Sequence, residues 1–383
     1  MSDIKPLIER LRTYTELPLE EARTLDPLHY TSPELFELEI EHIWKKEWLC
    51  VGHVSELPSA GDFFALQLID EPMIVVRGAD MEIRALTAIC RHRWMPLKTH
   101  GEVGHVRSLQ CPYHNWTYGL DGKLMRALHM DENRCFDAAK VGLPEFQLEI
   151  WNDLIFVNLD SEASPLAPRL ADVEDRLSLF KLPNGWEAAY RYDGIWSVNW
   201  KQCVENSELY HGFGLHRETV EPMVPTRNFR PDCSAHGEYW SITIWDQNME
   251  SPLAQKQLER SGWRPGDLGM DVPGTGIGII FPNALFDFSS SARGWYCLLP
   301  LGIDRSRMWC GSAEHAKGIN REWQRDPAAS FFTKFNHEDT VAFANMPAVM
   351  RSSQLETGLL SPMEENAFRS HRWTAEKILQ AIG

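Results

Sequence analysis

Two cysteines and two histidines lie close together in the chain, in two short motifs separated by 18 residues. The first motif is C-x-H, with Cys90 and His92, and the second is C-x-x-H, with Cys111 and His114. A zinc finger usually pairs Cys with Cys and His with His, which this spacing does not do. A Rieske [2Fe–2S] cluster instead needs two Cys on one iron and two His on the other. Two loops that each supply one Cys and one His therefore indicate a Rieske cluster, which would serve as an electron relay.

The other cysteines and the nearby histidines are not expected to bind metal. His100 and His105 fall in the loop between the two motifs, and we expect their side chains to be solvated. The remaining cysteines form no C-x-x-C pair and have no regular spacing, so they are expected to be buried thiols: Cys50, Cys135, Cys203, Cys233, Cys297 and Cys310.

A second group of metal-binding residue types follows later in the chain. Glu208, His211 and His216 form the pattern E-x-x-H-x-x-x-x-H within the stretch NWKQCVENSELYHGFGLH. On a helix, Glu208 and His211 would share one face because they are three residues apart. Gly212 and Gly214 lie between the two histidines, so the helix is expected to loosen there and let both imidazoles converge. Two histidines and one carboxylate, with coordination positions left open, form the kind of site at which non-haem Fe(II) binds O2.

The residue pattern alone leaves open which carboxylate completes this site. Glu205 and Glu208 are close to the histidines in the sequence. Asp339, in the stretch FNHEDTVAFANM, is a distant alternative on a predicted helix whose apolar residues would hold it against the core. Most acidic side chains on helices are solvated, so the pattern around Asp339 does not by itself identify a ligand.

Residues 46–160 contain the elements expected to position the first pair of motifs. Short β-rich runs alternate there with Gly and Asp turns, and PMIVVR and MEIRALTAIC form a predicted hairpin whose second strand leads directly into Cys90. Asp121 and Gly122 mark the turn of another predicted hairpin, in WTYGLDGKL. The sequence therefore predicts a small antiparallel β domain with metal-binding loops at its tips.

The flanking segments mix helices and strands. Residues 1–45 are predicted to be helical, with a Ser-Pro pair at 32–33 that suits a helix N-cap and first position. After the Pro-rich stretch SEASPLAPRL, residues 161–383 contain the apparent buried strands GTGIGIIFPNALFDFSSS and RGWYCLLPLGI and a predicted helical region at 331–350. The glycines of GTGIG do not open a helix after a strand, so they indicate no nucleotide-binding motif. The overall expectation is an α+β protein.

Composition excludes several classes of function. The chain of 383 residues has a formal charge of −16, which argues against nucleic-acid binding. Its longest apolar runs, such as LIFVNL, are too short to span a membrane. The charged start MSDIKPLIERLRTY lacks the apolar core of a signal peptide, so a cytoplasmic location is expected.

These motifs together resemble the oxygenase α subunit of the Rieske non-haem iron oxygenases, the aromatic-ring-hydroxylating family. The resemblance extends from DPLHYTSPELFELEIEHIWKKEWLCVGH, through CRHR, CPYHNWTYGLDGKL, NWKQCVEN and ELYHGFGLH, to ETGLLSPMEENAFRSHRW. It implies that residues 46–160 form an antiparallel β Rieske domain. It also implies that residues 161–383 form a helix-grip catalytic domain, an antiparallel sheet with helices, against which the segment 1–45 packs.

The resemblance also implies roles for individual residues. Glu208 matches an acidic bridge that links a cluster histidine of a neighbouring subunit to an iron-binding histidine, within a homotrimer. The chain departs from the family at Trp94, where many members have Gly, and in the spacing between Glu205-Asn206 and the bridging acid. The implied ligands are Cys90, His92, Cys111 and His114 for the cluster, and His211, His216 and Asp339 for the mononuclear Fe(II).

The function implied is that of a terminal oxygenase. Such a subunit takes electrons from NAD(P)H through a flavin reductase, a ferredoxin or both, and uses O2 to hydroxylate or oxidatively demethylate a small organic substrate. We expect this substrate to be aromatic. The alternative from another class is a non-catalytic Rieske electron-transfer protein with a C-terminal binding domain.

Overall fold

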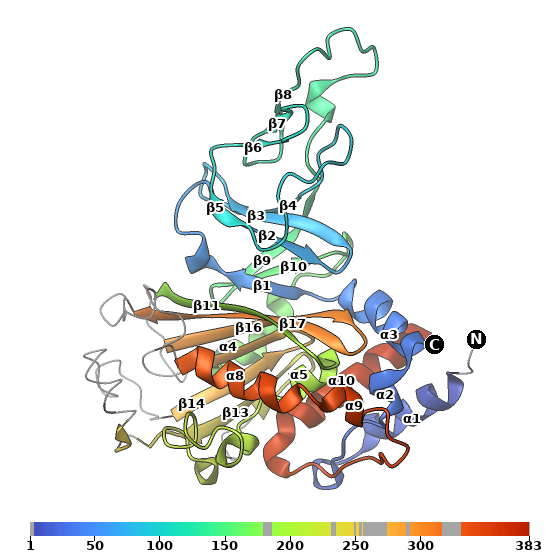
Figure 1. Cartoon of the computed structure of the whole chain (residues 1–383), viewed down its shortest axis with the longest axis vertical. Coiled ribbons are helices and arrows are strands. Elements are labelled where there is room, and N and C mark those ends of the chain that lie inside the picture. The colour runs from blue at the N-terminus through green and yellow to red at the C-terminus, as the bar shows by residue number, and fades with distance from the viewer. Residues whose placement is uncertain are drawn as a thin grey trace. The chain divides into compact units, whose positions relative to one another are not determined.

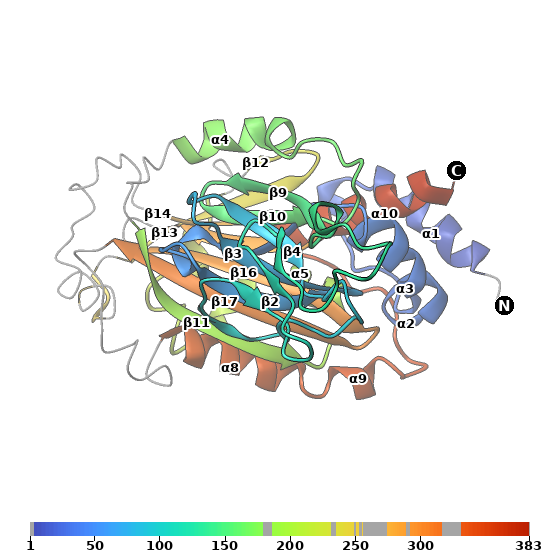
Figure 2. The same ribbon diagram turned by 90° about the horizontal axis from the view of Figure 1, so that it is seen from above.

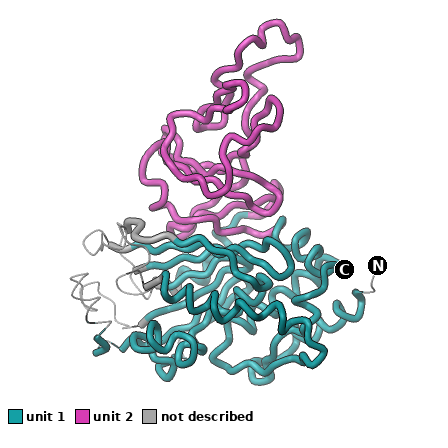
Figure 3. Tube along the Cα trace, in the orientation of Figure 1, with its two compact units in different colours: residues 1–45, 165–383 teal, residues 46–164 magenta. Residues whose placement is uncertain are grey.

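The computed structural model describes residues 4–178, 186–230, 235–248, 250–252, 255, 274–288, 292–315 and 331–382. The chain forms two compact units, coloured separately in Figure 3. One unit contains residues 1–45 together with 165–383, and the other contains residues 46–164. Each unit is built around its own antiparallel sheet (Figure 1), which confirms the predicted α+β class.

The unit formed by residues 46–164 is an antiparallel β domain. Its larger sheet has the strand order β1-β10-β9-β4-β3-β2-β5 and its smaller one the order β6-β7-β8. The hairpin predicted before Cys90 is confirmed as β3 and β4, and the turn at Gly122, with φ 79°, connects β7 to β8. The strand bounds are β1 Leu49–His53, β2 Asp62–Leu68, β3 Glu71–Arg77, β4 Ile83–Thr87, β5 Val103–His105, β6 Leu109–Gln110, β7 Thr117–Tyr118, β8 Leu124–Arg126, β9 Glu145–Trp151 and β10 Leu154–Asn158.

The other unit is built on one seven-stranded antiparallel sheet with the order β11-β17-β16-β15-β14-β13-β12. The apolar runs predicted as buried strands are confirmed as β14, β15 and β16. Figure 2 shows the helices α4 and α8 on opposite faces of this sheet. The strand bounds are β11 Trp186–Trp196, β12 Ala235–His236, β13 Trp240–Asp246, β14 Gly274–Ile280, β15 Ala284–Phe288, β16 Ala292–Gly302 and β17 Arg305–His315.

Helices from both ends of the chain belong to this second unit. The N-terminal helix α1 packs against the C-terminal helix α10. The predicted N-cap is confirmed, because the side chain of Ser32 accepts a hydrogen bond from the amide of Leu35 at the start of α3. The predicted helical region at 331–350 is confirmed as α8 and α9. The bounds are α1 Lys5–Glu16, α2 Leu28–Thr31, α3 Pro33–Glu39, α4 Ala171–Ser178, α5 Trp200–Glu205, α8 Phe331–Phe343, α9 Met346–Val349 and α10 Glu365–Ile382.

A buried ion pair joins the N-terminal helices to α5. Lys201 Nζ lies 2.6 Å from Glu39 Oε1, and the indole Nε1 of Trp200 donates to Glu39 Oε2 at 2.7 Å. Both charged side chains are almost completely buried. Because a charge buried without a partner is strongly unfavourable, this pair fixes where α5 lies relative to α3.

The prediction for the other cysteines is only partly correct. Cys50, Cys203, Cys297 and Cys310 are buried, as expected. Cys135 is exposed, so its expected burial was wrong, because it lies in a turn between β8 and β9 outside either sheet. Cys233 lies outside the described residues.

Candidate metal centres

The two cysteine loops have the same backbone structure. The amide N–H of Trp94 donates to the carbonyl of Cys90, and that of Asn115 donates to the carbonyl of Cys111, each at 3.1 Å. Trp94 and Asn115 both adopt left-handed conformations, with φ of 60° and 57°. This region favours Gly and tolerates Asn, so Trp94 occupies a turn position at which Gly would be less strained. The same turn, formed twice, presents one Cys and one His from each loop.

The four side chains of these loops fit a Rieske cluster. Cys90 and Cys111 are buried, with exposed fractions of 0% and 1%. The imidazole rings of His92 and His114 lie with their centroids 4.6 Å apart. The Nδ1 atom of His92 is buried and has no hydrogen-bond partner among the described residues, as a nitrogen that binds iron would require. The donor set, two thiols and two imidazoles, also matches the cluster's needs.

Aromatic side chains support the cluster loops. Tyr118 is fully buried, and its hydroxyl lies 3.3 Å from the Sγ of Cys90. That hydroxyl oxygen accepts the amide N–H of Arg91 at 3.0 Å, so its own proton can point to the sulfur. Trp116 stacks on His92 with the ring centroids 4.8 Å apart.

The two intervening histidines bond to protein groups. His105 is largely exposed, as expected, and its Nδ1 lies 2.9 Å from Asp62 Oδ1. His100 is half-buried rather than solvated as expected, and its Nδ1 accepts the amide N–H of Gln67 at 2.9 Å. Both rings are therefore engaged in orienting the loop between the two motifs.

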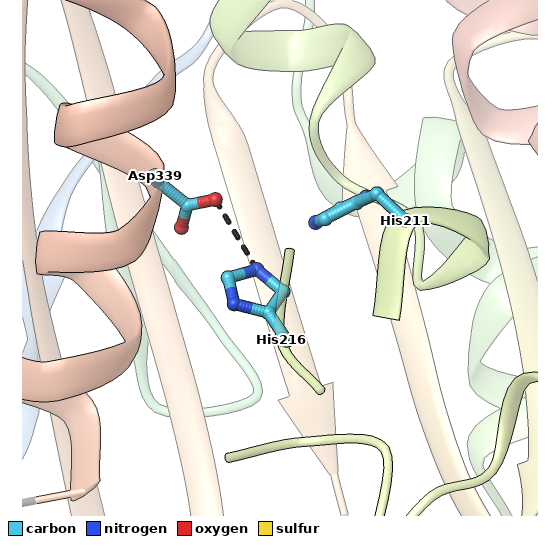
Figure 4. Close-up of side chains that lie close together, drawn as sticks. All are labelled: His211, His216 and Asp339. Carbon is cyan, nitrogen blue, oxygen red and sulfur yellow. Dashed lines mark ion pairs between the residues drawn. The ribbon is translucent and has the colours of Figure 1, made fainter. Parts of the chain in front are cut away.

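The second centre brings together His211, His216 and Asp339. One ligand atom from each lies within 4.8 Å of the others. Figure 4 shows Asp339 projecting from α8 towards the two imidazoles, which come from the segment after α5. His216 and Asp339 are buried and His211 is half-buried, so the centre is enclosed and His211 is its most exposed residue. Two imidazoles and a carboxylate on one side of a centre suit non-haem Fe(II).

Each histidine of this centre is held by a carboxylate at its far nitrogen. His211 Nδ1 lies 3.0 Å from Glu208 Oε1, and His216 Nδ1 lies 2.7 Å from Glu338 Oε2. Each carboxylate accepts the Nδ1 proton, which leaves both Nε2 atoms as the ligating nitrogens. The Nε2 of His211 is buried without a hydrogen-bond partner in the described part of the chain, and that of His216 faces Asp339 Oδ1 at 3.2 Å. These residues therefore fit a mononuclear metal ion.

Carboxylates dominate the electrostatics at this centre. Burial alone would lower the pKa of the His216 imidazole, but Asp339 and Glu338 outweigh burial and raise that pKa. The hydroxyl of Thr219 also donates to Glu338 Oε2, at 2.6 Å. A site with this excess of negative charge favours a cation.

The remaining candidates for the third ligand are used elsewhere. Glu205 Oε1 accepts from the hydroxyl of Tyr30 at 2.6 Å and lies 2.8 Å from His371 Nε2. The amide of Asn206 donates to Asp339 Oδ1 at 3.1 Å, which fixes the orientation of that carboxylate. Sequence reasoning missed these contacts of Glu338 and Asn206, although Glu338 stands directly before Asp339.

The local structure around His211 differs from the expected helix. The helix α5 ends at Glu205, so Glu208 and His211 do not share a helical face. Glu208 still reaches His211 because the chain turns, and Tyr210–Phe213 form a single 3-10 turn. The segment around Gly212 and Gly214 is thus a set of turns rather than a loosened helix, and both imidazoles converge as predicted.

Comparisons with protein-family models match two parts of the chain. A model described as a Rieske [2Fe-2S] domain matches residues 47–144. A model described as the ring hydroxylating alpha subunit (catalytic domain) matches residues 184–380. The first contains both cysteine loops, and the second contains the histidine and aspartate centre.

Relatives with known roles include mono- and dioxygenase subunits. The glycine betaine monooxygenase oxygenase subunit of Chromohalobacter salexigens is 36% identical over 196 residues, which are 51% of this chain and 43% of that protein. The chain thus spans less than half of that relative's length. The alpha subunit of biphenyl dioxygenase from Paraburkholderia xenovorans is 27% identical over 361 residues, covering 82% of this chain and 76% of that protein.

Solved structures share the fold. A quaternary ammonium Rieske monooxygenase superposes with a TM-score of 0.78 at 22% identity, covering 94% of this chain and 98% of that one. The naphthalene 1,2-dioxygenase of Rhodococcus sp. superposes with a TM-score of 0.77 at 19% identity, covering 98% of both chains.

Proposed function

The chain belongs to the ring-hydroxylating alpha-subunit family and carries a Rieske [2Fe–2S] domain, and from this we propose that it is the terminal oxygenase of a multicomponent Rieske oxygenase. Electrons come from NAD(P)H through a flavin reductase, a ferredoxin or both. When bound, the cluster supplies single electrons and the mononuclear Fe(II) activates O2. The observation that carries the proposal is the convergence of His211, His216 and Asp339, with both Nδ1 atoms held by carboxylates.

The ligand assignments and domain boundaries form part of this proposal. Residues 46–160 are assigned as the Rieske domain, and residues 161–383 with the segment 1–45 as the catalytic domain. The cluster ligands are Cys90, His92, Cys111 and His114, and the mononuclear iron ligands are His211, His216 and Asp339. The matching turns of the cysteine loops support the first set, and the short distances within the second centre support the other.

Glu208 is assigned as the bridge between the two kinds of metal site. It is 5% exposed, and one of its carboxylate oxygens holds the Nδ1 proton of His211 while the other accepts the amide of Tyr210. In a homotrimer, the same carboxylate would meet a cluster histidine of a neighbouring subunit. Its contact with His211 Nδ1 supports this role, because a carboxylate between two imidazoles fixes both tautomers.

The substrate is proposed to be a small organic molecule that is hydroxylated or oxidatively demethylated. The relatives' names include a quaternary amine, glycine betaine, and an aromatic hydrocarbon, biphenyl. An aromatic substrate remains our expectation, alongside a cytoplasmic location. No helix in the described part of the chain is long and apolar enough to cross a bilayer.

Iron content and oxygen uptake test this function. The reconstituted protein should hold three irons per chain and couple O2 uptake to product formation, with a reductase and a panel of aromatic acids, aryl ethers and methylated amines. Two irons per chain and no uptake would support the non-catalytic electron-transfer alternative. Asp339→Ala should lose the third iron and keep the visible spectrum of the cluster. Asp304→Ala, at an exposed position of the same unit, serves as the matched control.

A further inference from the structure

A row of residues crosses the catalytic sheet from β14 to β17. Asp287 on β15 pairs with Ile277 on β14 and with Gly294 on β16, and Gly294 pairs with Ser312 on β17. Residues directly opposite one another in an antiparallel sheet point to the same face. Asp287 and Ser312 therefore project from one face of the sheet, on either side of a residue without a side chain.

That face is the one that carries the mononuclear centre. Ile277 packs in a cluster that also contains Phe335, whose ring centroid lies 4.4 Å from that of His216. Two residues before Ser312, and so on the same face, Cys310 Sγ accepts from the amide of Asn336 at 3.6 Å. Asn336 is on α8, three residues before Asp339. The row thus lies on the wall of the sheet that faces α8 and the iron ligands.

Asp287 and Ser312 each have a polar atom that makes no hydrogen bond within the described part of the chain. The Oδ1 of Asp287 and the Oγ of Ser312 are both buried without a hydrogen-bond partner among the described residues. A buried polar atom without a hydrogen bond destabilises the folded state. Two such atoms in one row across a sheet therefore indicate a role in binding a ligand. Ser312 is fully buried, whereas Asp287 keeps some exposed surface, as a side chain that faces a ligand would.

Gly294 allows the carboxyl group of Asp287 to lie across the neighbouring strand. A Cβ atom at this position would lie 2.8 Å from Asp287 Cγ and closer still to Oδ1. Any side chain at position 294 would therefore push the carboxyl group away from Ser312. The absence of a side chain at Gly294 therefore allows the Asp287 carboxyl group to lie over β16, towards Ser312.

The surroundings of Asp287 suit a positive partner. Burial raises the pKa of Asp287 to about 7, against the opposing effect of the Gly294 amide. The charged groups that act on Cys310, between this row and α8, are the acids Asp287, Asp193 and Asp339. A carboxylate ligand would add a further negative charge here, whereas a cation beside Asp287 would favour its ionised form.

We propose that Asp287, with Ser312, binds a positively charged nitrogen of the substrate and so selects amines over neutral or acidic compounds of the same shape. This inference rests on the proposed oxygenase function and names its substrate class. A protonated amine would supply the N–H donors that both oxygen atoms lack. The reacting carbon would then lie towards His211 and His216, on the same side of the sheet.

Binding and turnover of matched compounds test the proposal. The probes are N-methylbenzylamine, which is protonated at neutral pH, benzyl methyl ether, its neutral counterpart, and phenylacetate. Wild-type protein should bind the amine at least tenfold more tightly than the ether in calorimetry, and should bind phenylacetate most weakly. Equal or weaker binding of the amine would overturn the proposal, whether or not the protein consumes O2. Failure of the oxygenase function would appear separately, as absent O2 uptake with every compound.

Substitutions at and near Asp287 test whether this carboxyl group causes the preference for the amine over the ether. Asp287→Asn should raise KM and Kd for the amine at least tenfold, with little change in either for the ether. Gly294→Ala keeps the charge but displaces the carboxyl group, and it should change amine binding in the same direction. Asp304→Asn, at an exposed position of the same unit, is the matched control and should change neither. Equal losses for amine and ether in Asp287→Asn, with the cluster spectrum intact, would show a merely structural role and reject the assignment.

Discussion

Glu338 and His216 are 122 residues apart in the chain, and their Oε2 and Nδ1 atoms lie 2.7 Å from one another. The next residue, Asp339, faces the opposite nitrogen of the same imidazole at 3.2 Å. Two adjacent acids on α8 therefore act on one histidine from two sides. Asp339 is placed to share a metal ion with His216, and Glu338 is placed to fix the tautomer that makes this possible.

Removing the Glu338 carboxylate should weaken mononuclear iron binding and leave the cluster intact. Glu338→Ala removes the acceptor of the His216 Nδ1 proton, and loss of such a partner typically costs 10–100-fold in metal affinity. Glu338→Gln keeps an acceptor oxygen without the charge, so its loss should be smaller. Iron titration of the apoprotein, with the visible spectrum as a measure of the cluster, gives both values. Equal affinity in wild type and Glu338→Ala would show that this contact does not orient His216.

Glu208→Gln should keep both metals and lose turnover. The amide can still accept the Nδ1 proton of His211, but it lacks the charge that would couple this histidine to a second one. We expect an unchanged cluster spectrum, three irons per chain and little product in a reductase-coupled assay. Glu356→Gln, at an exposed position of the same unit, provides the control. Normal product formation by Glu208→Gln would rule out the bridging role.

Tyr118→Phe should lower the reduction potential of the cluster. The hydroxyl lies 3.3 Å from Cys90 Sγ, and a hydrogen bond to a cluster sulfur stabilises the reduced, more negative state. A net hydrogen-bond energy of 0.5–1.5 kcal/mol corresponds to roughly 20–60 mV for one electron. A redox titration followed by circular dichroism measures this shift. An unchanged or higher potential would mean that the hydroxyl donates elsewhere.

The cluster loops could be predicted from the sequence because their ligands are local. Cys90 and His92 stand two residues apart, and Cys111 and His114 stand three apart, so the donor types and their spacing define the site without a fold. The strands that present them could also be predicted, because the hairpin β3–β4 consists of two runs rich in β-branched and other apolar residues, separated by a short Gly-Ala-Asp turn.

The mononuclear centre could be predicted only in part, because tertiary contacts complete it. His211 and His216 stand in one motif, but the pattern left Glu205, Glu208 and Asp339 as alternatives. The end of α5 at Glu205 could not be read from helical periodicity, because the turns that follow are fixed by packing and by contacts such as that between Asn206 and Asp339. The row through Asp287 depends on strand register, which one sequence does not specify.

Removing one partner of the buried ion pair between Lys201 and Glu39 should destabilise the protein more than removing both partners. Lys201→Met leaves the Glu39 carboxylate buried with its charge unpaired, which typically costs about 3–5 kcal/mol. The double variant Glu39→Gln/Lys201→Met removes both charges and keeps an oxygen acceptor for the Trp200 indole, so it should be more stable than Lys201→Met alone. Urea denaturation measures the free energies of unfolding. Lys46→Met, which breaks the more exposed pair with Asp160, should cost no more than about 1 kcal/mol.

Asp287→Asn should stabilise the protein at neutral pH and not at acidic pH. The folded-state pKa of Asp287 is about 7, above the ordinary value of 3.8. Well below pH 3.8 the carboxyl group is protonated in both the folded and unfolded states, so it contributes no pH-dependent difference. Between these two pKa values the Asp287 carboxyl group is ionised in the unfolded chain but largely protonated in the folded one. The free energy of unfolding therefore falls as pH rises, and this loss reaches a plateau above pH 7.

The amide in Asp287→Asn never ionises, so this penalty is absent from the variant. The free energy of unfolding of the variant should therefore exceed that of wild type by a growing margin from pH 4 to pH 7, and by a constant margin above it. Chemical denaturation at four or five pH values, without substrate, measures the difference. A margin that is independent of pH would show that Asp287 is already ionised in the folded protein. A variant stabilised at pH 7 that also loses selectivity for amines would identify Asp287 as a residue whose cost to stability serves substrate binding.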